Sequence, residues 1–374
     1  MISNCGGVSV AHGTLTGRTS PVFKTLMRKI QHSHHRPIRL GFVALADCAP
    51  IVMARELGLF ARYGIEVELH REVGWATIRD KILYGELEAA HAPAGLLVAA
   101  SCGLGSVRAD CLTGLVLNLH GDAITLSANL WRRGVRDGRS LCKEVAQGGE
   151  PLIFGVAYQY SSHSFLLRTW LRSHGIEPDR DVRIVVVPPP QVAANLRAGH
   201  LDGYCVGEPY NSLAVLVKSG WCVAISPELA PGHPEKVLMV RKDFAERSEH
   251  DHLALIAALV EACRFCDRPE NRERITETLA QIHYVNVPIR ALQMSLGGTF
   301  DFGNGRIEKV PNFHVFARGN ANEPTWEKAR WVIANLHSAG LLDDPAEVPA
   351  EHADRWFRAD IHQQALQLIQ PTDS

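Results

Sequence analysis

Apolar runs and amphipathic stretches alternate along most of the chain from residue 38 onward. Ile38–Val43 is a nearly continuous apolar run, and Ile65–Leu69 alternates apolar and acidic residues; both patterns are typical of β-strands. Ala76–Tyr84 and Ala94–Cys102 have the spacing and length of helices. Because strand and helix patterns alternate in this way, we expect an α/β fold with mainly parallel sheets.

A second set of strands and helices begins at Pro151–Val156. His163–His174 predicts a helix, and Val182–Val187 predicts a buried strand. Arg132–Gly149 is rich in charge and glycine, so we interpret it as a crossing of the chain between two lobes. Val237–Arg241 then predicts the strand by which the chain returns to the first lobe.

These patterns predict a terminal arm and two lobes. Residues 1–36 form a flexible N-terminal arm, residues 37–124 and 237–374 form lobe I, and residues 125–236 form lobe II. A chain that crosses twice between two lobes is typical of a receptor that closes about a hinge. A ligand is then expected in a cleft between the lobes, at the ends of strands and helices.

Composition narrows the class of function. The 374 residues carry a formal net charge of -1, which argues against a basic surface for direct nucleic-acid binding. The chain has no run of about 18 apolar residues, so we expect no membrane span. Nine cysteines, an odd number at irregular spacing, fit a reducing compartment better than a disulfide framework.

The stretch before the first predicted strand lacks the pattern of an export signal. It has no apolar run of about 7–15 residues behind a charged start. Cys5 also lacks the apolar run that a lipoprotein signal would need. We therefore expect a cytoplasmic protein with an N-terminal arm.

Five motifs, in order, resemble the nitrate/bicarbonate-binding family of solute receptors, and the resemblance runs from about residue 37 to residue 340. It implies a type II periplasmic-binding-protein-like fold with two α/β lobes, a ligand cleft and a hinge. It also implies a binding protein rather than an enzyme. The 18 histidines form no spaced His/Cys or His/Glu cluster outside residues 1–36, so we expect no metal site, and we expect no cofactor. The motifs are Leu40–Ile51, Gly74–Asp80, Val187–Gln191, Cys205–Asn211 and His233–Lys236.

Family members without an export signal resemble the nitrate/nitrite sensor of bacterial nitrate assimilation. Such a sensor holds an RNA-binding antiterminator of the ANTAR type inactive and releases it when the anion binds. The resemblance therefore implies that nitrate or nitrite and this antiterminator are the partners. The alternative is the solute-binding component of an ABC transporter for nitrate or bicarbonate. A third hypothesis is an enzyme that resembles the pyrimidine-precursor synthases, but the chain has no match to their cysteine-rich loop.

Three residues have the chemistry that a planar oxyanion requires. Trp75 offers an indole N–H and a ring face, although a core aromatic is the alternative. Lys236 precedes an apolar strand, where an unpaired charge is costly, and the family places its ligand-pairing lysine here. His163 lies at a predicted helix start and matches the ligand-contact histidine of the family, although such a histidine is more often structural.

Three further positions complete the candidate set. Gly207 allows a close approach of its backbone N–H, and Gln191 is a lesser contact. Asp122 stands where nitrate-binding relatives commonly carry a carboxamide. A carboxylate there repels nitrate unless it is turned away, protonated, or paired with Lys236 or His163, and it suits bicarbonate better.

Motifs of other chemistries are weak or absent. The sequence contains no G-x-G-x-x-G, no G-x-x-x-x-G-K-[ST] and no H-E-x-x-H. Cys263 and Cys266 form a C-x-x-C within a helical pattern, so we interpret them as structural cysteines. His32–His35 is interpreted as part of a solvated tail.

Overall fold

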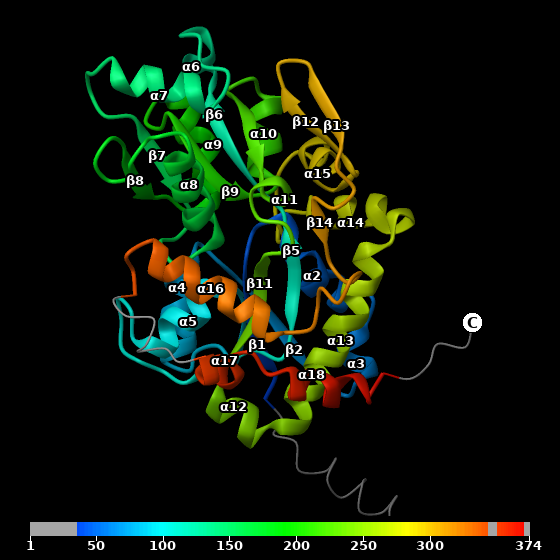
Figure 1. The fold of residues 1–374 in the computed structure, drawn as a ribbon. Helices are drawn as coiled ribbons and strands as arrows, with labels where there is room; N and C mark the ends of the chain where they lie inside the picture. The colour runs from blue at the N-terminus through cyan, green and yellow to red at the C-terminus, as the bar shows by residue number, and fades with distance from the viewer. Residues whose placement is uncertain (1–35, 343–349, 370–374) are drawn as a thin grey trace, which may run out of the picture. The chain divides into compact units, whose positions relative to one another are not determined.

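The computed structural model describes residues 36–342 and 350–369, so nearly all of the predicted arm, with Cys5 and His32–His35, lies outside the described residues. Residues 37–374 form one compact unit. Its strands build two large sheets and one separate hairpin (Figure 1). The division into two lobes at residues 124 and 237 stays a prediction.

The larger sheet has seven strands in the order β14-β5-β11-β3-β1-β2, with β4 beside β11. β1 is parallel to β2 and β3, whereas β11 is antiparallel to β3, β4 and β5. The strands are β1 (Ile38–Val43), β2 (Val67–Glu72), β3 (Ala89–Pro93), β4 (Cys111–Leu112), β5 (Val116–His120), β11 (Pro234–Arg241) and β14 (His314–Val315).

Helices cover both faces of this sheet, because successive residues of its strands point to opposite faces. In β11, Leu238 and Val240 join one apolar core and Val237 and Met239 join the other. Helices α2 (Ala49–Glu56), α3 (Leu59–Arg62), α13 (Glu249–Asp267), α14 (Arg272–Leu279), α15 (Ile289–Leu296) and α18 (Ala359–Leu366) contribute to the core of Leu238. Helices α4 (Trp75–Leu83), α5 (Ala94–Cys102), α16 (Trp326–Ser338) and α17 (Ala350–Trp356) contribute to the core of Val237.

The smaller sheet has five strands in the order β10-β6-β9-β7-β8. β7 is parallel to β8 and β9, whereas β6 is antiparallel to β9 and β10. The strands are β6 (Asp122–Ser127), β7 (Ile153–Val156), β8 (Arg183–Val186), β9 (Gly203–Gly207) and β10 (Gly220–Ile225). The helices of this part are α6 (Ala128–Arg132), α7 (Gly138–Ala146), α8 (Ser162–Ser173), α9 (Pro189–Ala198), α10 (Tyr210–Leu216) and α11 (Ser226–Leu229).

The expectation of mainly parallel sheets is wrong, because both sheets are mixed. Parallel neighbours such as β1 and β2 are joined by a helical crossover, as a parallel pair requires. The strands β6 and β11 instead carry the chain from one sheet to the other, and both run antiparallel to their neighbours. An apolar pattern predicts a strand but does not specify its direction.

Two more expectations are corrected by the topology. Arg132–Gly149 is not a crossing, because the strands on either side of it, β6 and β7, belong to the same sheet. The chain passes between the sheets at Gly121, which separates β5 from β6, and again between β10 and β11. Val182–Val187 is not a buried strand, because β8 lies at the edge of its sheet and Val186 is 55% exposed.

A hairpin near residue 300 was not predicted from the sequence. It consists of β12 (Thr299–Gly303) and β13 (Arg306–Lys309), which pair antiparallel. Phe300 and Phe302 pack in one apolar cluster with Ala123 of β6. A segment that follows α15 thus contacts the five-stranded sheet, as Figure 1 shows beside α10.

Two predictions from composition have structural counterparts. Cys263 and Cys266 are buried free thiols on α13, and burial raises the pKa of both. None of the helices that the structure describes has the length and apolarity needed to cross a membrane.

Candidate functional site

Charged side chains gather where the two sheets come together. Asp122 is the first residue of β6, and Glu235 and Lys236 lie near the start of β11. All three are fully buried. They are neighbours because only Gly121 separates β6 from β5, and β5 pairs with β11. Ionised groups at such depth must be paired, so their partners define the site.

Lys236 is held between two carboxylates. Its Nζ lies 2.9 Å from Oδ2 of Asp47, and it also contacts the carboxylate of Glu235. Burial opposes the charged form, but Asp47 and Glu235 outweigh it and raise the pKa of Lys236 above its ordinary value. Burial likewise opposes ionisation of Asp47, yet Lys236 and His91 lower its pKa. The ammonium group therefore stays charged in the core.

Trp75 lies beside this ammonium group. Its ring centroid is 5.4 Å from Nζ of Lys236, within the range of a cation–π contact, and 5.4 Å from the ring of His91. Nε1 of Trp75 is buried and has no hydrogen-bond partner within the described part of the chain. A buried donor without a partner is costly, so this N–H is a candidate contact for an acceptor oxygen.

His163 joins carboxylates from both sheets. Its Nε2 lies 3.1 Å from Oδ1 of Asp122 and 3.2 Å from Oε1 of Glu235. Burial would lower the pKa of His163, but the two carboxylates raise it to about 9. The ring is therefore an imidazolium ion at neutral pH, located in the first turn of α8.

The two serines before His163 are Ser161 and Ser162. Neither caps α8 with its hydroxyl, because Ser161 donates to the carbonyl of Tyr158 and Ser162 donates to Glu235. Ser162 thereby adds a third donor to Glu235, beside Lys236 and His163. These donors outweigh the burial of Glu235 and hold its pKa well below the ordinary value.

The charge of Asp122 is less well compensated by neighbouring cations than that of Glu235. Burial raises its pKa to about 7, the nearby charge of Glu235 acts in the same direction, and His163 opposes both. Oδ2 of Asp122 has no hydrogen-bond partner among the described residues. Gly207 is the register partner of Asp122, and a Cβ at Gly207 would lie 3.4 Å from Oδ1 of Asp122. A Cβ there would make an ordinary van der Waals contact, so packing against Asp122 does not by itself require glycine at this position.

The structure thus brings together Trp75, Asp122, His163, Gly207 and Lys236 from the predicted set. Gln191 is exposed in the first turn of α9, away from the buried charges. His120, two residues before Asp122, has backbone partners at both of its ring nitrogens. Its Nδ1 lies 2.9 Å from the carbonyl oxygen of Asn312, and its Nε2 accepts from the backbone N–H of Gly232.

Sequence reasoning missed three members of the site. The three are Asp47, His91 and Glu235. Asp47 was noted only as part of the motif Leu40–Ile51, but its Oδ1 lies 2.9 Å from Nε2 of His91. Glu235 was noted only as part of the motif that contains Lys236. The position of Asp47, just after the carboxyl end of a buried strand, is the signal that could have indicated a ligand site.

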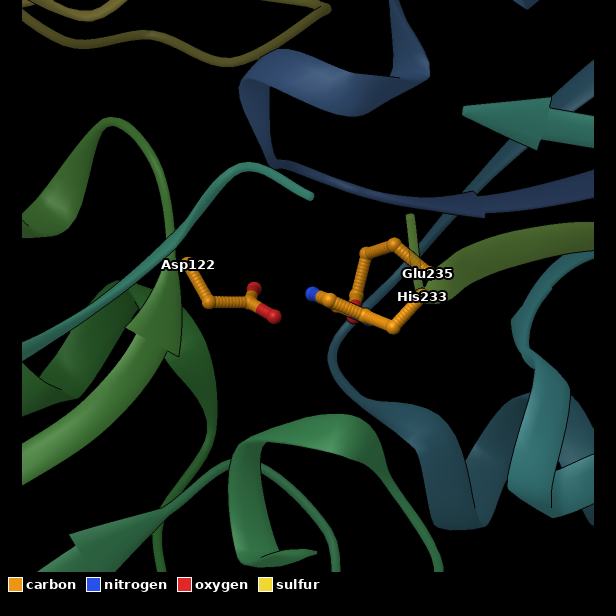
Figure 2. A group of neighbouring side chains, drawn as sticks. All are labelled: Asp122, His233 and Glu235. Carbon is orange, nitrogen blue, oxygen red and sulfur yellow. The ribbon is translucent and has the colours of Figure 1, made fainter. Parts of the chain in front are cut away.

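Donor atoms of Asp122, His233 and Glu235 lie within 4.8 Å of one another, and Figure 2 shows these side chains pointing toward a common point. Three such donors can in principle hold a metal ion. Here Lys236 and His163 already contact Glu235, and these two cations would repel a metal ion at the same carboxylate. We describe the site as a network of side-chain charges rather than as a metal centre.

A second buried carboxyl group, Glu208, follows β9. Its Oε2 accepts hydrogen bonds from the hydroxyl of Ser295, at 2.8 Å, and from the backbone N–H of Ser212, at 3.2 Å. Burial raises the pKa of Glu208 from the ordinary 4.5 to about 7, and these hydrogen bonds oppose the shift only in part. Between pH 4.5 and 7 the folded protein therefore keeps a proton that the unfolded chain releases.

Glu208 is expected to make stability fall as pH rises from 4.5 to 7, by up to about 3 kcal/mol. In Glu208→Gln, whose amide oxygen can accept the same two hydrogen bonds, this contribution is absent. Denaturant unfolding of both proteins at pH 5, 6 and 7 checks the prediction. A difference in unfolding free energy that does not change with pH would contradict it.

The chain is similar to one protein family and to several known proteins. A profile of the NMT1-like family matches residues 31–280. The nitrate/nitrite binding protein NrtA of Nostoc sp. (strain PCC 7120 / SAG 25.82 / UTEX 2576) is 32% identical over 353 residues, covering 90% of this chain and 78% of that protein. The nitrate import ATP-binding protein NrtC of Synechocystis sp. (strain ATCC 27184 / PCC 6803 / Kazusa) is 36% identical over 334 residues, covering 88% of this chain and 50% of that protein. The chain spans about half the length of the ATP-binding relatives that it matches.

A solved structure covers almost the same residues. The crystal structure of the periplasmic nitrate-binding protein NrtA from Synechocystis PCC 6803 matches with a TM-score of 0.85 at 27% identity, covering 89% of each chain. This match confirms the predicted α/β fold of the periplasmic-binding-protein type.

Proposed function

Because this chain belongs to the NMT1-like family, as one of its NrtA-like solute receptors, we propose that it binds a small oxyanion, with nitrate as the first candidate. The observation that carries the proposal is the pair of buried cations, Lys236 on β11 and His163 on α8, which both contact Oε1 of Glu235. The relatives named for nitrate support the choice of ion.

The arrangement suggests how an anion would couple the two sheets. Trp75 and Lys236 belong to the part built on the seven-stranded sheet. Asp122, on β6, and His163, on α8, belong to the part built on the five-stranded sheet. An anion that contacts both sets stabilises the arrangement in which they are close. It shifts an equilibrium between conformations only by its difference in affinity for them.

We place the chain in anion transport, as the receptor that presents the ion to an ABC importer. The match to NrtC, a protein named for nitrate import, supports this role. The cytoplasmic sensor that controls an ANTAR-type antiterminator stays a prediction from the sequence, as does the cytoplasmic location. Affinity purification of the full chain from its own cells distinguishes the roles: permease and ATPase subunits support transport, and an antiterminator released by nitrate supports sensing.

Isothermal titration of the purified protein with nitrate, nitrite and bicarbonate tests the binding proposal. We expect heat and one-site binding with nitrate at pH 7. In Trp75→Phe, the ring that faces Lys236 is kept and the indole N–H is lost, so nitrate affinity is expected to fall about tenfold, the effect of one lost hydrogen bond.

Trp221→Phe is the matched control. Trp221 is also buried, and its Nε1 has no hydrogen-bond partner in the described ranges, but it lies on β10 against Trp131. We expect its removal to leave nitrate affinity unchanged. No heat with any of the three anions would refute the proposed function, and equal losses in both variants would refute the contact of Trp75.

A further inference from the structure

We propose that Asp122 takes up a proton when the site binds nitrate, and that Asp122 thereby determines which oxyanion the protein accepts. The inference rests on the proposed function, since it requires an oxyanion beside Asp122.

The first step is the unequal sharing of one cation. Asp122 and Glu235 both contact the same nitrogen of His163, at 3.1 and 3.2 Å. Glu235 also has Lys236 and the hydroxyl of Ser162. Asp122 has His163 as its cation and lies close enough to Glu235 to donate to it once protonated, and its Oδ2 is buried without a partner from the residues that the structure describes. Of the two carboxylates, Asp122 is the one that gains most from a proton.

The second step concerns the charged and titratable groups around Asp122. Lys236 and His163 stay cationic near neutral pH, because carboxylates raise their pKa values. Asp47 and Glu235 stay ionised, because cations lower theirs, and the pKa values of the neighbouring histidines are lowered by burial. The pKa of Asp122, near 7, is the value among these groups that lies closest to neutral pH. Several charged or titratable groups surround Asp122. Asp47 lies in the turn after β1, His91 on β3 and His163 on α8, while His233 directly precedes β11 and Glu235 and Lys236 lie on β11.

Charge counting gives the reason for proton uptake. The ionised carboxylates of Asp47, Glu235 and Asp122 exceed the two cations by one. Nitrate adds another negative charge and has only acceptor oxygens, so an ionised Asp122 repels it. A protonated Asp122 removes that charge and donates its O–H to nitrate.

Bicarbonate differs because it carries its own O–H. That group can donate to an ionised Asp122, so bicarbonate needs no proton from solvent. Formation of the nitrate complex therefore takes up one nitrate and one proton per protein. Formation of the bicarbonate complex takes up one bicarbonate and no proton. No covalent bond forms or breaks except the O–H of Asp122.

Proton linkage makes the proposal measurable. Titration with nitrate in two buffers of different ionisation enthalpy gives the number of protons taken up. We expect nearly one proton per nitrate at pH 8 and almost none at pH 6, with nitrate affinity about fivefold weaker at pH 8 than at pH 7. Bicarbonate is expected to bind at pH 8 without proton uptake by the protein.

Asp122→Asn is the decisive variant, since its amide N–H donates to nitrate but does not titrate in this range. Its nitrate affinity is expected to be the same at pH 6 and pH 8, and thermal unfolding checks that it is folded. Nitrate binding to the wild type at pH 8 without proton uptake overturns the inference while the proposed function stands. The absence of heat with nitrate and bicarbonate at both pH values overturns the proposed function itself.

Discussion

Replacement of Lys236 by methionine is expected to abolish nitrate binding and to lower the free energy of unfolding by about 3–5 kcal/mol. Methionine retains an apolar stem of similar length but removes the ammonium group. Asp47 and Glu235 then remain buried without their main cation, which is the costly way to break a buried ion pair. Titration with nitrate and unfolding in denaturant measure the two effects.

Lys81→Met is the matched control for this substitution. Nζ of Lys81 lies 2.7 Å from Oε1 of Glu72, but 32% of its side chain is exposed. The pair is partly buried, because only 8% of the Glu72 side chain is exposed, so we expect a smaller loss of stability than in Lys236→Met and unchanged nitrate affinity.

A double variant keeps the test valid if Lys236→Met does not fold. Asp47→Asn removes one of the carboxylates that the single variant leaves without a cation. The double variant Asp47→Asn/Lys236→Met is therefore expected to be more stable than Lys236→Met and still to lack nitrate binding. Affinity equal to that of the wild type in the folded double variant would contradict the role of Lys236.

The sequence predicted local elements well where an apolar run has clear ends. Ile38–Val43 and Ala94–Cys102 were predicted with the bounds that the structure shows. Ala94–Cys102 is closed by Gly103, which adopts a left-handed conformation after α5. Such local elements depend on residues that are neighbours in the chain, so they can be predicted from a single sequence.

Features that depend on distant partners were not predictable in the same way. The exposure of β8 follows from its place at the sheet edge, and the hairpin near residue 300 is stabilised by Phe300 and Phe302 packing against β6 and β10. The candidate site shows the same limit. Trp75, His163 and Lys236 were proposed singly from their chemistry and the family resemblance. Their pairing with Asp47 and Glu235 depends on which strand ends meet.

One close approach between the two parts of the site gives a further test. Gly95 lies in the first turn of α5, and a Cβ at this position would lie 2.4 Å from the carbonyl oxygen of Tyr160. Tyr160 is three residues before His163, on the segment that leads into α8. The atom that would be struck is backbone, so the segment itself would have to move.

Gly95→Ala is therefore expected to weaken nitrate binding at least about tenfold, since displacement of Tyr160 moves His163 away from Asp122 and Glu235. At a solvent-exposed helix position, a change from glycine to alanine would stabilise the protein by about 1 kcal/mol. A loss of stability in Gly95→Ala would therefore result from the collision with Tyr160. Gly74→Ala is the control, because a Cβ there meets nothing within 4 Å and its backbone is extended, although Trp75 is adjacent. Titration with nitrate and thermal unfolding of both variants check the prediction. Wild-type affinity in Gly95→Ala would show that the position of His163 does not depend on this contact.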